Sequence, residues 1–347
     1  MSPDSAAVTP GPIADLFPGY FALVMATGII SIGAEQQDIA VLPEALFAVA
    51  AVGYVVLWVL LVLRVTRYPR RFLDDATDHA KGFAFLTTVA GTNVLGSACG
   101  VVMGWWTLAW VLWFVSLPVY VVLLYLTLIS VVIISDKPGL GAGINGTWFL
   151  IIVSTQSIAV LGALLLMREP SDLLAFVTIA MFTLGLVVYL IVMTMVFLRW
   201  TFDPLDPTEA SPPAWIAAGA VAISVLAGSN ILLAADVSER IRRLVPFLEG
   251  MTVLAWATAT FWFPLMVAIG VWRHMVRRLP LRYHPSYWAL VFPIGMYGAA
   301  TFRMRAAIGL DGLAWLPQVT LVAALVAWSA TFLGLVHSLA RALRRVS

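Results

Sequence analysis

The chain has 347 residues, of which 62% are hydrophobic and only 11% are charged, and its formal net charge is +2. Together with a mean hydropathy of +0.97, this composition excludes an ordinary soluble globular domain and places the chain in a lipid bilayer. Cys99 is the only cysteine, so an intrachain disulfide and a cysteine-based metal cluster are excluded as well.

Ten hydrophobic segments come close to the length of about 20 residues that a helix needs to cross a membrane. They are expected near residues 17–34, 45–63, 82–103, 105–134, 147–167, 173–198, 214–235, 245–272, 287–302 and 313–340. No connecting stretch has the composition of a separate folded domain, so residues 17–342 are interpreted as one ten-helix transmembrane domain. Residues 1–16 contain no Lys or Arg, unlike a cleaved signal peptide, and are expected to remain as a cytoplasmic N-terminal segment.

Five of these segments open with similar sequences at nearly constant spacing. The openings start at Gly19, Gly82, Gly146, Pro213 and Ser286, in steps of 63, 64, 67 and 73 residues. Each step has room for two membrane crossings, which predicts one helical hairpin repeated five times. Repeated units in membrane proteins surround a central pathway or build a site between them, so a conduit for a solute is the leading hypothesis.

The basic residues predict the orientation. If the N-terminus is cytoplasmic, fourteen of the 20 Lys and Arg residues fall in cytoplasmic loops and the C-terminal end, and six fall outside. This bias satisfies the positive-inside rule and predicts that both termini are cytoplasmic, in the inner or plasma membrane of the cell. Because topology accounts for the basic loops, a nucleic-acid partner is not expected.

Ionisable side chains are almost absent from the centres of the expected helices, whereas proton-coupled pumps and voltage sensors carry them there. Arg303 falls at a helix end and is interpreted as interfacial. The four histidines lie in loops or near the end of the last segment. Neither a haem nor a metal site is therefore expected, and no cofactor is assigned.

One polar loop carries an alternative from a different class. The run from Asp74 to His79 has the residue types of a catalytic or metal cluster, and on that basis a membrane-embedded enzyme or sensor is the competing hypothesis. Its place in a basic loop favours solvated counter-charges to Arg70 and Arg71 instead. We therefore expect no enzymatic activity.

Uncharged polar residues concentrate on the odd-numbered segments, and bulky aromatic residues concentrate on the fourth and eighth. This contrast predicts an inner ring of odd helices and an outer, lipid-facing ring of even ones, although close helix packing explains each small residue taken alone. Nine residues after the repeat starts come Gly28, Gly91, Thr155, Ala222 and Gly295. Helix bends at such glycines would expose backbone N–H groups that attract an anion without a formal charge.

Two stretches resemble a known family. The sequence from Phe17-Pro18-Gly19 through Thr27-Gly28-Ile29-Ile30, and the sequence Tyr287 to Pro293, are similar to the tellurite-resistance/dicarboxylate transporter family, which includes bacterial homologues of plant slow anion channels. The resemblance implies an all-α membrane fold of ten transmembrane helices, arranged as five hairpins around a quasi-five-fold central pore. It also implies a homotrimer in which each subunit has its own pore, with odd helices lining it.

The resemblance also implies a gate. In channels of this family a phenylalanine on the ninth helix, directly before a proline, occludes the pore, and Phe292 followed by Pro293 matches it. Counted from the repeat starts, Met25, Thr88, Ile152 and Gly219 lie at the depth of Phe292 and are candidate neighbours. The remaining lining candidates are Gly28, Gly91, Thr155, Gly295 and Pro293. Family members often carry a proline early in the fifth helix, where this chain has Ile151 and Ile152, so a kink is not expected there.

The sequence thus predicts an integral membrane anion channel or transporter that contacts lipid and carries a small inorganic or carboxylate anion. An alternating-access carrier or exporter of a C4-dicarboxylate, sulfite or a tellurium oxyanion is the alternative. Uncharged hydroxyl groups and backbone dipoles would stabilise the anion, since no buried Arg is expected to bind it in a bidentate manner. These features do not rank the anions.

Overall fold

The computed structural model describes Gly11, residues 13–204 and residues 212–344, and every regular element in these ranges is helical. The fold class predicted from the sequence, an all-α membrane protein, is confirmed. Five helices form an inner group: α1 (Ala22–Glu35), α4 (Thr87–Val101), α7 (Leu150–Leu166), α9 (Ile216–Leu233) and α11 (Trp288–Ile308). Five longer helices form an outer group: α2 (Leu42–Arg67), α5 (Trp106–Ile133), α8 (Asp172–Phe202), α10 (Glu239–Val271) and α12 (Trp315–Arg344).

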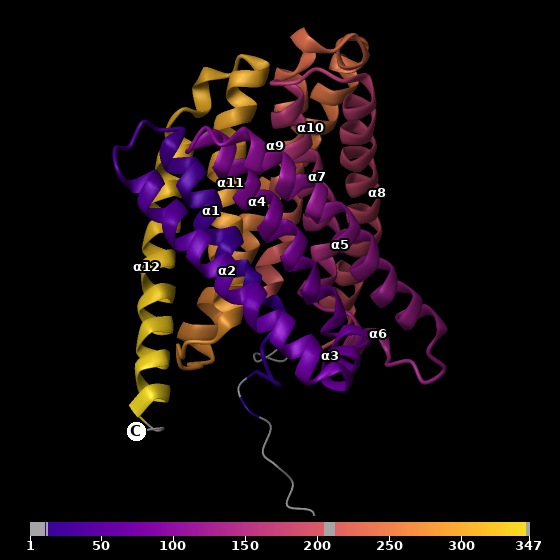
Figure 1. The fold of residues 1–347 in the computed structure, drawn as a ribbon. Helices are drawn as coiled ribbons and strands as arrows, with labels where there is room; N and C mark the ends of the chain where they lie inside the picture. Colours follow the sequence, from indigo (N-terminus) through magenta and orange to yellow (C-terminus); the bar gives the residue numbers. More distant parts are fainter. Residues whose placement is uncertain (1–10, 12, 205–211, 345–347) are drawn as a thin grey trace, which may run out of the picture.

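The inner helices close into a ring. Going round it, α1 contacts α4, α4 contacts α7, α7 contacts α9, α9 contacts α11, and α11 returns to α1. Each outer helix packs against the inner helix of its own hairpin and against the next inner helix, so that α2 touches α1 and α4, and α12 touches α11 and α1. Five hairpins therefore surround one axis, with the same two contacts repeated at every step (Figure 1).

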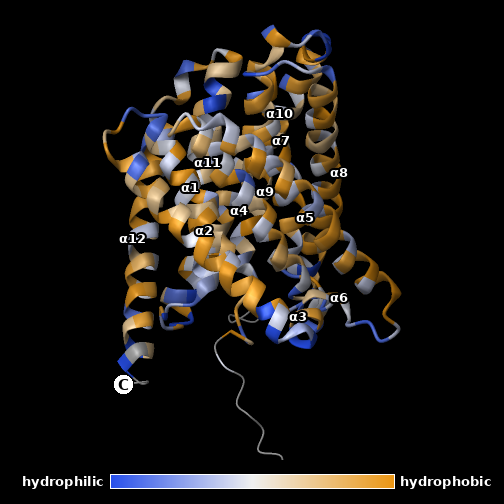
Figure 2. Cartoon of the chain, in the orientation of Figure 1, coloured by the Kyte–Doolittle hydropathy of each residue, from blue (hydrophilic) through white to orange (hydrophobic). Residues whose placement is uncertain are grey.

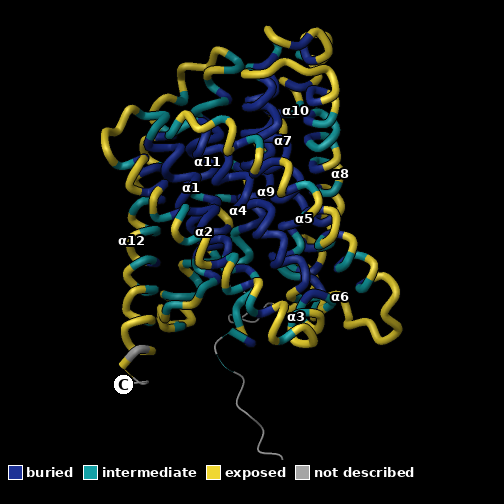
Figure 3. Tube along the Cα trace, viewed as in Figure 1, coloured by how far each residue is buried: buried dark blue, intermediate teal, exposed yellow. Residues whose placement is uncertain are grey.

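The two groups differ sharply in burial. In the most apolar 18-residue stretch of α1, α4, α7 and α9, between 83 and 100% of the residues are buried, against 11 to 33% in the five outer helices. The outer helices carry apolar side chains on their exposed faces (Figures 2 and 3). Lipid-facing outer helices and protein-enclosed inner helices account for this pattern, because hydrocarbon requires apolar side chains only on surfaces that reach it.

By length and apolarity, nine helices among the described residues qualify as membrane spans, one fewer than the ten segments read from the sequence. The helix left out is α11, the shortest segment of that prediction, whose C-terminal part contains Arg303 and Arg305. It nevertheless lies in the ring between α9 and α1, and 13 of its residues are buried. Enclosure by protein relaxes the demand for a continuous apolar sequence, so hydropathy understates this helix.

Every inner helix begins with a tight 3₁₀ turn. The turns span Pro18–Phe21, Gly82–Leu86, Gly146–Phe149, Pro212–Trp215 and Pro285–Tyr287, and they coincide with the five repeat starts found in the sequence. They lie together at one end of the ring, which we call the start end, with the short helices α3 (Pro69–Ala76) and α6 (Leu140–Gly143) and the C-terminal end of α12 (Figure 1). The turns pack tightly: a Cβ on Gly146 would overlap the carbonyl oxygen of Pro213.

A hydrogen bond joins each outer helix to the next inner helix at every step of the ring. The five bonds are Tyr54 to Thr92 (3.0 Å), Tyr120 to Thr155 (2.7 Å), Tyr189 to the Ala217 carbonyl (3.3 Å), Thr260 to Tyr297 (2.6 Å), and Trp328 to Thr27 (2.9 Å). In four of them an aromatic side chain of the outer helix reaches a polar group of the inner helix. The bonds hold neighbouring hairpins together and turn the hydroxyl groups of Thr27, Thr92 and Thr155 away from the axis.

Removing one of these bonds is expected to weaken the ring. Tyr120→Phe keeps the ring shape of the side chain and deletes only the hydroxyl group. We expect a loss of roughly 0.5 to 1 kcal/mol in the free energy of unfolding in detergent micelles, because Thr155 keeps its bond to the Ile151 carbonyl. Tyr125→Phe is the matched control, since Tyr125 lies on the same helix with 55% of its surface exposed. Equal losses in both variants would contradict a specific role for the Tyr120 bond.

Candidate functional site along the ring axis

A small cavity lies on the axis at the start end, and all five inner helices reach it. Ala22, Thr87, Leu150, Ile216 and Ala289, at or next to the first residue of each inner helix, line it. Met25 and Phe292 line it one helical turn deeper. The cavity is therefore the place where the five repeats converge, and Phe292 stands where it ends.

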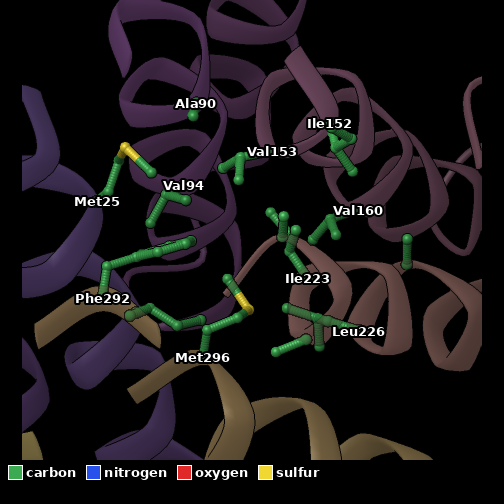
Figure 4. Close-up of a cluster of buried hydrophobic side chains, with 14 of the residues drawn as sticks. Met25, Ala90, Val94, Ile152, Val153, Val160, Ile223, Leu226, Phe292 and Met296 are labelled. Carbon is green, nitrogen blue, oxygen red and sulfur yellow. The ribbon is translucent and has the colours of Figure 1, made fainter. Parts of the chain in front are cut away.

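Beyond the cavity the axis is filled by apolar side chains, which we call the axial cluster. It consists of Met25, Ala90, Val94, Val153, Ile223, Leu226, Phe292 and Met296, with Ile152 and Val160 beside them (Figure 4). The Phe292 ring points from α11 into this cluster and is 1% exposed. Apolar surfaces of this kind are wetted poorly.

The structure separates the residues predicted from the sequence to lie at the level of Phe292. Met25 and Phe292 line the axial cavity, and Ile152 belongs to the packed side chains of Figure 4. Thr88 lies elsewhere: it lines a groove on the outer surface with Trp58 and Val122, facing away from the axis. Thr155 also faces outward, towards Tyr120.

A shift in register explains the difference. Measured from the repeat starts, α1 begins three residues after Gly19 whereas α4 begins five residues after Gly82, so counting from these starts misaligns the second repeat by two residues. Aligning the repeats on the last aromatic residue of each turn, such as Phe21 and Phe149, places Val153 at the level of Met25. The same alignment would give Val89 instead of Ala90 in the second repeat, where Leu86 directly precedes α4, so this signal in the sequence does not identify every axial position.

The predicted glycines serve helix packing. A Cβ on Gly28 would lie 2.8 Å from Val94 on α4, and one on Gly91 would lie 3.4 Å from the carbonyl oxygen of Phe21. Gly295 would meet Ile30 at 3.0 Å, and Gly219 would meet the Pro293 ring at 2.7 Å. Each lies at a contact between neighbouring helices of the ring, as expected where small residues let helices approach closely.

A set of contacts around Arg64, which we call the clamp, ties the segment before the first turn to α2 and α3 at the start end. This buried side chain of α2 donates 3.0 Å hydrogen bonds to the carbonyl oxygens of Ala14 and Leu16, and it forms an ion pair with Asp75. Lys81 bonds the same carboxylate at 2.9 Å. Burial alone raises the pKa of Asp75, but the hydrogen bonds from Lys81 and Arg64 outweigh it and lower the pKa below its ordinary value.

The loop from Asp74 to His79 is thereby accounted for as a structural element. Asp75 belongs to the clamp, and the Asp78 carboxylate accepts hydrogen bonds from the backbone N–H groups of Ala80 and Lys81 at 2.9 Å. The carbonyl oxygen of His79 accepts a bond from the Trp148 indole. These contacts tie the loop to the rest of the start end.

Phe17 sits beside the axial cavity. It lines both that cavity and a wider, more polar opening formed with the acidic residues Asp15, Asp74, Asp75 and Asp78. Its ring packs edge-on against His284 at a centroid distance of 5.4 Å. Burial lowers the pKa of His284, so the imidazole is neutral at pH 7.

Comparison with known proteins gives the family. The model of the SLAC1-type voltage-dependent anion channels matches residues 15–336, nearly the whole chain. The chain belongs to the voltage-dependent anion channel family. It is accordingly a membrane anion transporter or channel, and the family resemblance read from the sequence is confirmed.

The chain is also similar to individual proteins from several organisms. An uncharacterised membrane protein of Mycobacterium tuberculosis is 37% identical over 45% of this chain and 79% of its own length. An uncharacterised transporter of Methanocaldococcus jannaschii is 23% identical over 86% of this chain and 89% of its own. A sulfite efflux pump of Trichophyton rubrum is 22% identical over 84% of this chain and 82% of its own. These relatives are transporters or membrane proteins, and none is named as an enzyme.

The contact between Gly219 and Pro293 holds α9 against the helix that carries Phe292. Gly219→Ala would place a Cβ 2.7 Å from the Pro293 ring, and we expect the overpacking to cost roughly 1 to 3 kcal/mol of stability. Gly250→Ala is the control, because no atom lies within 4 Å of a Cβ built there. Thermal unfolding in detergent measures both variants, and a Gly219→Ala protein as stable as the control would contradict the contact.

Proposed function

We propose that anions cross the membrane along the axis of the inner ring, and that Phe292 is the gate. The observation that carries this proposal is the position of Phe292: it ends the cavity that all five repeats line, and its ring fills the axis together with Met25 and Met296. The path is closed in this conformation by apolar packing alone. Opening then requires the phenyl ring to leave the axis.

The five inner helices also favour anions over cations at the start end. Their N-terminal ends converge on the axial cavity, and each helix N-terminus carries a partial positive charge from its backbone dipoles. Thr87 and Thr147 also line this cavity, but their hydroxyl groups donate to the carbonyl oxygens of Ala84 and Ala80, so the dipoles of the helices are the attraction left for an anion there. An anion at this point is stabilised without a buried charge, as at other helix N-termini.

The orientation and the assembly are parts of the same proposal. The excess of Lys and Arg in loops at the start end favours a cytoplasmic start end, with both termini inside and the chain in the inner membrane. A homotrimer with one pathway in each subunit follows from the family resemblance. Light scattering of the purified protein, with detergent mass subtracted, tests the trimer, and a mass of one or two chains would contradict it.

A carrier is the second candidate, because one of the relatives is named as a sulfite efflux pump. An alternating-access carrier turns over far more slowly than an open channel conducts. Single-channel recording from lipid bilayers separates the two: discrete current steps identify a channel, whereas uptake without resolvable current identifies a carrier.

Truncation of the gate should open the path. We expect Phe292→Ala to raise anion flux into liposomes at least about tenfold, which corresponds to lowering the barrier by roughly 1.4 kcal/mol. Phe292→Leu should raise it less because it keeps more bulk. The double variant Phe292→Ala with Met296→Ala should raise it further, since Met296 remains in the axial cluster when Phe292 is removed.

Phe261→Ala is the control for this experiment, because Phe261 lies on α10 with 64% of its surface exposed, on the outer side of the fold. Deleting a buried aromatic side chain costs roughly 3 to 5 kcal/mol, so each variant must first show an unchanged oligomeric size. A well-folded Phe292→Ala protein that conducts no more of any anion than the parent protein would contradict the assignment of Phe292 as the gate.

Cysteine labelling tests the lining. In a Phe292→Ala, Cys99→Ala background, cysteine at Ala90 or Val153 should react with a small membrane-impermeant thiol reagent. Cysteine at Thr88 or Thr155 should not, because these side chains face outward, towards the outer helices. Labelling at Thr88 and Thr155 but not at Ala90 or Val153 would contradict this lining and support the register counted from the repeat starts. Comparing inside-out with right-side-out vesicles for cysteine at Ala289 reports which side of the membrane the start end faces.

A further inference from the structure

An arginine lies at the other end of the ring axis. The Nε of Arg303 on α11 donates a 2.8 Å hydrogen bond to the Oδ1 of Asn230 on α9, and Asn230 is 1% exposed. Arg303 follows Phe292 by eleven residues, and Asn230 follows Gly219 by eleven. Eleven residues make about three helical turns. Arg303 therefore lies on the same face of α11 as Phe292, and Asn230 lies on the same face of α9 as Gly219, each about 16 Å further along the axis.

The charge of Arg303 has no acidic partner within the described ranges. Its single hydrogen bond there is made by Nε, which leaves the N–H groups of Nη1 and Nη2 free to donate elsewhere. Arg305, two residues on, points to a different side: it pairs with the exposed Asp311 at 3.5 Å and donates to the Leu310 carbonyl. A partly buried cation without a counter-charge is costly, and an anion beside it removes that cost.

The same spacing of eleven residues identifies the side chains that the other three inner helices place at the level of Arg303. Eleven residues after Met25, Ala90 and Val153 come Gln36, Val101 and Leu164. Gln36 follows the last residue of α1, and its buried Oε1 has no hydrogen-bond partner. This end of the axis therefore combines one guanidinium, two amides and two aliphatic side chains.

We propose that Arg303, held by Asn230, forms a recognition site for an oxyanion at this mouth of the pathway. The proposal rests on the function proposed above and adds the class of substrate. A guanidinium presents parallel N–H donors that match two oxygens of one planar or pyramidal oxyanion, such as sulfite, nitrate or a carboxylate. A halide offers a single atom and does not use both donors in this way. Asn230 acts as a positioning residue that fixes the plane of the guanidinium.

Binding can be measured without transport. The full-length protein in neutral, lipid-free detergent is heated in sulfite and in chloride at equal ionic strength. We expect sulfite to raise the melting temperature by on the order of 2 °C relative to chloride. The difference should vanish in Arg303→Gln, shrink in Arg303→Lys and persist in the control Arg305→Gln, whose side chain faces elsewhere.

A second variant guards against misfolding. Asn230→Asp has nearly the same shape as the parent and gives Arg303 a carboxylate partner, so the protein should remain folded while the sulfite effect is lost. A phospholipid phosphate is another source of the same oxyanion chemistry. If stabilisation appears only when anionic lipid is added and never with sulfite alone, the site binds lipid and the proposal is overturned.

Flux measurements test the Arg303 site independently of the melting experiment. In the Phe292→Ala background, the ratio of sulfite to chloride permeability should fall by about tenfold or more in Arg303→Gln and in Asn230→Asp, because a charged hydrogen bond is lost. An unchanged ratio in both folded variants overturns the recognition site. Failure of the proposed pathway looks different: Phe292→Ala then conducts no anion, while the melting experiment still reports whether Arg303 binds sulfite.

Discussion

Each inner helix is kept out of lipid by two outer helices, the partner in its own hairpin and the helix that precedes it in the ring. This shielding is the constraint on which the rest of the fold depends. Because the inner helices meet only protein, they can carry threonine, serine, asparagine and glycine at membrane depth, which hydrocarbon would not tolerate on a lipid-facing surface. The outer helices carry the apolar surface for the whole molecule, and their bonds to the next hairpin close the ring.

The inner helices turn hydroxyl groups outward and apolar side chains towards the axis, the reverse of what the sequence predicts for a polar lining. Hydroxyl groups such as those of Thr92 and Thr155 bond to tyrosines of the outer helices, while the axis itself is filled by aliphatic side chains, Met296 and Phe292. In the proposed pathway the barrier therefore consists of packed apolar side chains, which water wets poorly. At one end of this cluster the N-terminal ends of the five inner helices converge on the cavity, and Arg303 lies towards the other end.

Much of this architecture could be predicted from the sequence because it repeats. Five similar openings located the five turns, and the contrast between small polar and bulky aromatic segments separated inner from outer helices. The register of the axial side chains could not be read in the same way. Counted from the repeat starts, α4 begins two residues later than α1, which corresponds to a rotation of about 200°, and Ala90 rather than Thr88 therefore lies at the level of Met25.

The partner of Arg303 could not be predicted from the sequence for a different reason. From the sequence it stands at a helix end, where an arginine ordinarily reaches the membrane surface, and nothing local distinguishes it from Arg305. Only the fold brings Asn230, 73 positions away along the chain, within hydrogen-bond distance of its Nε. Partners supplied by another repeat are invisible to spacing within one helix, even when both stand at the same repeat position.

Because the hydroxyl groups of the inner helices bond outward, the positions that hold the hairpins together are separate from the positions that face the axis. Side chains on the outer face of the ring hold the hairpins together, and a change there disturbs the whole assembly. Axial side chains make few directional bonds, so substitutions there alter width and polarity while leaving the joints between hairpins intact. A fold organised in this way can diversify its cargo by changing a handful of central residues, and distant relatives can share one frame while handling different solutes.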